Sequence, residues 1–160
     1  MATKLTKFHS FFKRFQRGTA KAKPSIYIAS GIEFATSLDW RDWIKQNLND
    51  KYNVILPDLI PCPYQKGSYE FAGWYYENFI KQDITDVVNC DQFFIFIDQS
   101  FCAGAGGKAE LTLAAVLEKP ITYCVHNVSP ENMNKWVIGC LHNATRVDDF
   151  NKLIEHYKKL

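Results

Sequence analysis

The stretch Gln92-Phe-Phe-Ile-Phe-Ile-Asp98 decides the fold, because it is an almost wholly apolar run bounded by polar residues. Strands in the middle of a parallel sheet are buried on both faces and have this composition. The chain continues into the glycine-rich run Gly104-Ala-Gly-Gly-Lys-Ala-Glu110, so we expect a loop over 99–107 and a helix over 107–117. Ligand sites in open α/β sheets typically form where a strand leads through a loop into a helix. Here the beginning of that helix carries one carboxylate, Glu110.

The segments on either side alternate between strand and helix patterns. Short apolar runs predict strands, and apolar residues at helical spacing predict helices. Residues 57–68 contain three prolines and a glycine, and they predict a long loop suited to covering a ligand. The alternation predicts a single α/β domain with a flavodoxin-like or Rossmann-like parallel sheet and helices on both faces. The expected strands are 25–29, 52–56, 92–97, 120–125 and 145–147, and the other expected helices are 38–47, 69–89, 132–140 and 148–159.

Length, composition and charge narrow the class of protein. A chain of 160 residues that is 47% hydrophobic and 15% aromatic is typical of one globular domain, which we place at residues 25–160. That domain holds 12 basic and 17 acidic residues, which argues against nucleic acid as a partner. No apolar run has the roughly 18 residues that a membrane span needs. Five cysteines without a CxxC spacing predict free thiols in a reducing, intracellular compartment, and no metal site.

Residues 1–24 form a distinct N-terminal arm. They contain seven Lys and Arg residues and no acid, and Leu5, Phe8, Phe12 and Phe15 recur at helical spacing. A basic amphipathic start resembles a mitochondrial targeting sequence. Two further interpretations stay open: an anchor that holds the chain to a larger complex or another subunit, and a solvated tail.

Two carboxylates are the candidates for chemistry. Glu110 falls near the start of its helix, where backbone N–H groups and the helix dipole favour an ionised carboxylate by about 0.3–1 kcal/mol. Asp83 lies on a helix that is expected to turn Ile80, Ile84 and Val87 inward, so its side chain could reach the same cleft. A pair of carboxylates suits the cleavage of glycosidic bonds. The alternative is that both are ordinary helix residues, Glu110 in a first turn and Asp83 on an exposed face.

Several other residues could bind a ligand at this loop. Gly104, Gly106 and Gly107 would allow a ligand close to the backbone, where N–H groups could hold a hydroxyl or a phosphate. Asp98, at the carboxyl end of the strand, is either a second polar group of the site or a turn former. The loop has neither a dinucleotide pattern nor a P-loop pattern, so we expect no cofactor, and a flavin or dinucleotide protein is the weaker alternative.

Taken together, these features resemble the nucleoside 2-deoxyribosyltransferase family, which includes the 2-deoxynucleoside 5′-monophosphate N-hydrolases. The similarity covers roughly residues 25–136, and the order and spacing of short motifs carry it. These motifs are Ile26-Tyr27 followed by Gly31, Asp83 eight residues before Asp91, the run Gly104–Glu110 with Lys119-Pro120 after the next helix, and Asn132 four residues before Trp136.

The resemblance implies roles for these residues. Glu110 would attack the anomeric carbon of a 2-deoxyribosyl group, Asp83 would position Glu110 or bind the base, and Tyr27 would line the pocket with Gly31. Asn132 would reach the site of a neighbouring subunit, so the resemblance implies a homo-oligomer. The implied function is nucleotide salvage, by base exchange or hydrolysis of deoxynucleosides or their 5′-monophosphates.

The glycine-rich loop departs from the family pattern in three ways. It is longer by about one residue, and Lys108-Ala109 stands just before Glu110, where the family usually has a glycine and a larger residue. Gly104 stands where the transferases carry an aspartate that meets the 5′-hydroxyl, while Ser100 and Lys108 lie nearby and tilt the expectation slightly toward phosphorylated substrates. These departures keep a second function open: a non-catalytic subunit of a larger assembly, mitochondrial or cytoplasmic, that retains the fold.

Overall fold

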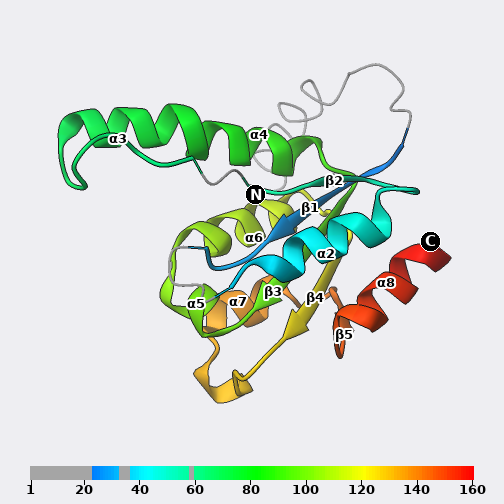
Figure 1. Ribbon diagram of the computed structural model, residues 1–160. Helices are drawn as coiled ribbons and strands as arrows, with labels where there is room; N and C mark the ends of the chain where they lie inside the picture. Colours follow the sequence, from blue (N-terminus) through cyan, green and yellow to red (C-terminus); the bar gives the residue numbers. More distant parts are fainter. Residues whose placement is uncertain (1–22, 33–36, 58–59) are drawn as a thin grey trace, which may run out of the picture.

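The computed structural model describes residues 23–32, 37–57 and 60–160, so the expectations for residues 1–22 lie outside the described part of the chain (Figure 1). Five parallel strands form one sheet in the order β2-β1-β3-β4-β5. This order, with helices between consecutive strands, confirms the predicted α/β fold. The strands are β1 (Ser25–Ala29), β2 (Asn53–Ile55), β3 (Gln92–Ile97), β4 (Ile121–Val125) and β5 (Thr145–Val147).

The helices fall on both sides of this sheet. One side is covered by α2 (Asp39–Leu48) and α8 (Phe150–Lys159), and the other by α4 (Lys81–Asn89), α6 (Gly106–Val116) and α7 (Lys135–Cys140). Shorter helical segments complete the chain: α3 (Tyr69–Tyr75), the π-helix η1 (Tyr76–Ile80), α5 (Gln99–Ala103) and the 3₁₀ turn η2 (Pro130–Asn132).

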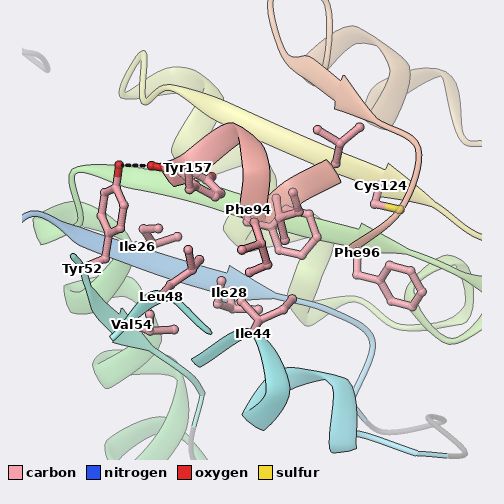
Figure 2. Packing of buried hydrophobic residues seen from close by; sticks show 13 residues of the cluster. Ile26, Ile28, Ile44, Leu48, Tyr52, Val54, Phe94, Phe96, Cys124 and Tyr157 are labelled. Atoms are coloured by element: carbon pink, nitrogen blue, oxygen red, sulfur yellow. Dashed lines mark hydrogen bonds between the residues drawn. The ribbon is translucent and has the colours of Figure 1, made fainter. Parts of the chain in front are cut away.

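Alternating side chains of the central strands build two cores. Ile26 and Phe94 point toward α2 and α8, where Figure 2 shows them packed with residues of both helices. On that side the Tyr52 hydroxyl donates a hydrogen bond of 2.9 Å to the backbone oxygen of Tyr157. Tyr27 and Phe93 point to the opposite side, and their rings stack at 5.8 Å. A strand such as β3 is therefore buried on both faces, as its apolar composition predicts.

The helix expected over 69–89 forms, but a π-helical segment within it changes which side chains face the sheet. The segments α3, η1 and α4 run on without a break, and α3 reaches beyond the sheet (Figure 1). A π-helical turn contains more residues than an α-helical turn, so it rotates the side chains that follow. The expectation that Ile80 and Ile84 turn inward is therefore wrong, since they are 42% and 46% exposed. Val87 is buried as expected, and Asp83 is half-buried.

One expected loop contains a short helix, and one expected helix begins later than the sequence pattern indicated. The segment 99–107, expected as a loop, begins with α5, because the Asp98 side chain accepts a 2.8 Å hydrogen bond from the backbone N–H of Phe101 and caps that helix. The helix expected over 132–140 begins three residues later, since the Asn134 side chain accepts a bond from the N–H of Trp136.

All five cysteines lie in the described part of the chain and are free thiols. None of the helices in the described ranges combines the length and the apolar character needed to cross a membrane.

Candidate functional site

The side chains of Tyr27 and Glu110 meet on the side of the sheet that α4 and α6 cover. Tyr27 leaves the middle of β1 and is fully buried, while Glu110 lies in the second turn of α6 and is half-buried. The Tyr27 hydroxyl and the Oε2 atom of Glu110 are both buried, and neither makes a hydrogen bond of regular geometry. A hydrogen bond between the two side chains nevertheless contributes to the pKa shifts of both, so they lie next to each other in a contact of irregular geometry. Buried polar atoms usually have well-formed partners, so this pair is a candidate position for a ligand.

The negative charge of Asp83 affects the pKa values of both Tyr27 and Glu110. Burial, followed by the negative charge of Asp83, raises the pKa of Glu110 to about 8, while the Tyr27 hydroxyl and the charge of Arg41 act in the opposite direction. Burial also raises the pKa of Tyr27, and Glu110 and Asp83 add to that effect. Asp83 and Glu110, which the sequence selected as a pair, therefore act on each other across α4 and α6. The expectation that the helix dipole keeps Glu110 ionised is wrong, because burial and a neighbouring carboxylate outweigh it.

Arg41 also belongs to this cluster, although it was not among the residues selected from the sequence. It lies on α2, is only 3% exposed, and donates a 2.7 Å hydrogen bond from Nη2 to the backbone oxygen of Pro57. Its Nε–H has no partner. The sequence did hold a signal: Arg41 shares the inward stripe of its helix with Ile44 and Leu48, where a charged residue is unexpected.

The unpaired polar atoms are concentrated at one edge of the sheet. In the part of the chain that the structure describes, five buried side-chain polar atoms lack a hydrogen-bond partner. Tyr157, which carries one of them, lies on α8 in the other core. The remaining four surround the carboxyl ends of β1 and β2, where ligands bind in open α/β sheets. They are Tyr27 Oη, Ser30 Oγ, Arg41 Nε and Glu110 Oε2.

Three other predicted ligand residues serve the fold at this edge. The Ser100 hydroxyl donates a 2.6 Å hydrogen bond to the backbone oxygen of Gly31, and the Asp98 carboxylate caps α5. Gly31 is needed for close packing, because a Cβ atom there would collide with the backbone nitrogen of Phe101. Their binding of a substrate stays a prediction, but their side chains and contacts already have structural functions.

The glycine-rich run divides into packed and open positions. A Cβ atom on Gly107 would lie 2.9 Å from the Phe101 ring, whereas one on Gly106 would meet nothing within 4 Å, and one on Gly104 would meet only a backbone oxygen at 3.5 Å. The Lys108 ammonium donates a 2.7 Å hydrogen bond to the backbone oxygen of Cys102, which ties α6 to α5. Gly104 and Gly106 therefore have open space beside them, whereas Gly107 is closely packed.

Asn132 lies away from the carboxylates. It lines a hollow of about 300 Å³ together with Lys108, and neither Tyr27 nor Glu110 lines that hollow. The implied contribution of Asn132 to a neighbouring subunit stays a prediction. The other residues that line the hollow are Phe101, Cys102, Met133, Asn134 and Val137.

Two motifs that supported the resemblance have structural functions at the opposite edge of the sheet. The Asp91 carboxylate accepts hydrogen bonds of 2.7 and 2.9 Å from the backbone N–H and hydroxyl of Ser25, which joins the starts of β1 and β3. The Lys119 ammonium donates bonds to the backbone oxygens of Val88 and Cys90, at 2.7 and 2.6 Å, and so caps the end of α4. These residues hold the sheet and α4 in place and do not face Glu110.

Comparison with known proteins supports the fold. No protein-family model and no curated protein matches the chain. Among solved structures, the chain is similar to a structure described as that of a conserved protein from Enterococcus faecalis V583, with a TM-score of 0.62 and 17% sequence identity. The similarity covers 86% of this chain and 99% of the other.

Proposed function

We propose that this protein cleaves the N-glycosidic bond of 2-deoxynucleosides or their 5′-monophosphates, with Glu110 as the nucleophile. The observation that carries the proposal is the set of unpaired buried polar atoms at the carboxyl ends of β1 and β2, which includes the Oε2 atom of Glu110. Without a ligand there, Glu110 and Tyr27 have only their irregular contact with each other and the charge of Arg41 to offset the cost of desolvation. A sugar, which carries both hydroxyl donors and acceptor oxygens, can satisfy both groups.

The chemistry follows from the two coupled carboxyl groups. The Glu110 carboxylate bonds to the anomeric carbon as the bond from that carbon to the base nitrogen breaks, and the base leaves with the bonding electrons. The base takes a proton from solvent or from a neighbouring acid. Water or a second base then attacks the anomeric carbon and releases Glu110, so the same intermediate serves hydrolysis and transfer. Asp83 adds negative charge beside a transition state that resembles an oxocarbenium ion.

The raised pKa of Glu110 sets a pH dependence for this reaction. With a pKa of about 8, Glu110 is ionised in about a tenth of the empty molecules at pH 7. Attack requires the ionised form, so kcat/KM is expected to rise with pH and level off above about 8. A profile that falls over this interval would instead assign the protonated Glu110 the role of a general acid.

A panel of substrates tests the proposal. Purified protein is incubated with purine and pyrimidine deoxynucleosides and with their 5′-monophosphates, with and without a second free base, and products are separated by chromatography. Released base without an acceptor indicates hydrolysis, and an exchanged product indicates transfer. The absence of both products across the panel would overturn the proposal.

A second candidate function is that of a non-catalytic subunit, which the projecting helix favours. Tyr69, Tyr75 and Tyr76 are 91%, 42% and 51% exposed, on a segment that reaches beyond the sheet. Exposed aromatic residues are enriched at protein interfaces. If the protein proves inactive on the panel, the mass of any complex that it forms with itself or with a partner can be measured by light scattering. Serine substitutions at Tyr75 and Tyr76 that dissociate this complex would support the non-catalytic function. An unchanged mass of the complex would contradict it.

A further inference from the structure

The long helix formed by α3, η1 and α4 carries an exposed apolar stripe. None of the residues described in α3 or η1 is buried, and none belongs to either core. Tyr76, Ile80 and Ile84 follow one another at four-residue spacing on one side of the helix, and each is between 42% and 51% exposed. We call these three residues the stripe. Single exposed apolar residues are ordinary, but a continuous row of them indicates a binding surface.

The N-terminal arm joins the fold where this helix ends. The backbone N–H of Ser25 donates a 2.7 Å hydrogen bond to the carboxylate of Asp91, which lies two residues after the end of α4 at Asn89. Followed back from that point, the helix crosses the sheet and projects beyond it (Figure 1). With seven, five and nine residues in its three segments, it is about 31 Å long. A chain of 22 residues spans about 33 Å as a helix and roughly 75 Å when extended, so residues 1–22 can reach the whole stripe.

The composition of the arm complements this helix in polarity and in charge. Residues 1–22 contain six Lys and Arg residues and no acid, and their large apolar residues recur at helical spacing. The helix over 69–89 contains four acids and a single lysine, so the two segments carry opposite net charge and attract each other. The apolar residues of the arm are Leu5, Phe8, Phe12 and Phe15, and the acids of the helix are Glu70, Glu77, Asp83 and Asp86.

The two other stretches outside the described residues, 33–36 and 58–59, fit the stripe less well. They follow the carboxyl ends of β1 and β2, and described residues hold both of their ends. A stretch of four residues that must return to the fold reaches at most about 7 Å away from it, whereas the stripe is about 12 Å long. The arm has the length and the composition that these stretches lack.

We propose that residues 1–22 bind along the projecting helix of their own molecule, with the apolar residues of the arm on the stripe. The Lys and Arg residues of the arm lie beside the acids of the helix. Burying the stripe removes apolar surface from water, and the opposite charges set the alignment of the two segments. The arm thereby stabilises the helix that carries Asp83. This interaction does not depend on any reaction at Glu110.

Hydrogen exchange of the full-length protein tests this interaction. A helix with few packing contacts opens easily and exchanges its amide protons quickly, so a bound arm slows exchange over 76–84. In a variant that combines Phe8→Ser, Phe12→Ser and Phe15→Ser, these amides are expected to exchange at least about tenfold faster. Thr6→Ala combined with Ser10→Ala, on the opposite side of the same helical pattern, is the matched control and should change nothing. Equal exchange over 76–84 in all three proteins would overturn the proposal.

The reciprocal change is made on the helix and read out on the arm. Ile80→Ser combined with Ile84→Ser alters two exposed positions, so the fold should be retained, and the amides of residues 5–15 should exchange about tenfold faster. Unchanged exchange in the arm would contradict the proposal, because the arm would then be bound elsewhere or not at all.

Carbodiimide cross-linking of a mixture of ¹⁴N-labelled and ¹⁵N-labelled protein identifies the molecule that supplies the arm. We expect links from the arm lysines to Glu70 or Glu77 that join peptides of the same isotope only. Pairs of mixed isotope would show that the arm of a second copy occupies the stripe, and would overturn binding within one molecule. The Lys81–Glu77 pair, 3.0 Å apart, is the internal control, and its link without any arm link would also overturn the proposal. Slow exchange over 76–84 that appeared only with vesicles of anionic phospholipid would assign the arm to a membrane surface instead.

Discussion

Replacing Glu110 with glutamine should stabilise the protein at neutral pH. Glu110 has a pKa of about 8 in the folded chain against its usual 4.5. Below pH 4.5 it is protonated in both the folded and unfolded states, so it costs nothing. As the pH rises toward 8 the unfolded chain ionises while the folded chain keeps its proton, and the folded state loses stability. The loss is about 3 kcal/mol at pH 7 and approaches about 5 kcal/mol above pH 8.

Glutamine has nearly the same shape and no charge, so Glu110→Gln avoids this loss. Urea unfolding of both proteins at pH 4.5, 7 and 8.5 should show little difference in the free energy of unfolding at the lowest pH. The variant should be more stable by about 3 kcal/mol at pH 7. Glu70→Gln, at an exposed position in the first turn of α3, serves as the control and should show no comparable change with pH. The reasoning would be refuted if the difference in the free energy of unfolding between the two proteins did not change with pH. It would also be refuted if Glu110→Gln were less stable than the unaltered protein at pH 8.5.

Three further substitutions probe the candidate site and the packing beside it. Asp83→Asn removes a negative charge that raises the pKa of Glu110, so a ¹³C NMR titration of the Glu110 carboxyl should show a midpoint below that of the unaltered protein. An unchanged midpoint would show that the charge of Asp83 does not influence the ionisation of Glu110. Gly31→Ala should destabilise the fold by about 1–3 kcal/mol or more, because the added Cβ atom collides with the backbone of α5. Gly106→Ala has open space and a helical position, so it should be neutral or stabilising by up to about 1 kcal/mol, and equal thermal shifts for the two variants would contradict this difference.

The sequence predicted the sheet well because its strands carry a strong local signal. β3 consists almost entirely of large apolar residues, and both of its faces are covered in the structure. The strand 25–29 and the strand 145–147 were predicted at the bounds that the structure shows. Short helices carry a weaker signal, since α5 has only five residues and depends on one cap from Asp98.

The candidate site was predictable in part. The Asp83 and Glu110 pair followed from helix positions and from the family resemblance, and both residues do interact electrostatically. The protonation of Glu110 could not be predicted, because it depends on burial, which a sequence pattern does not measure. The inward-facing side of the helix around Asp83 could not be predicted because of the π-helix. No residue propensity marks where an extra residue enters a helical turn. Arg41 required the tertiary contact with Pro57 to be recognised.

The rate of base release by Glu110→Gln, compared with the unaltered protein at pH 7, tests the proposed chemistry most directly. The substrate is the deoxynucleoside or monophosphate that the panel shows to react fastest, and the free base is measured over time. Because this variant is expected to be the more stable protein, a loss of turnover cannot be attributed to unfolding. We expect turnover to fall by more than about a thousandfold, as when a nucleophile is removed. A rate within about tenfold of the unaltered protein would show that Glu110 is not the nucleophile.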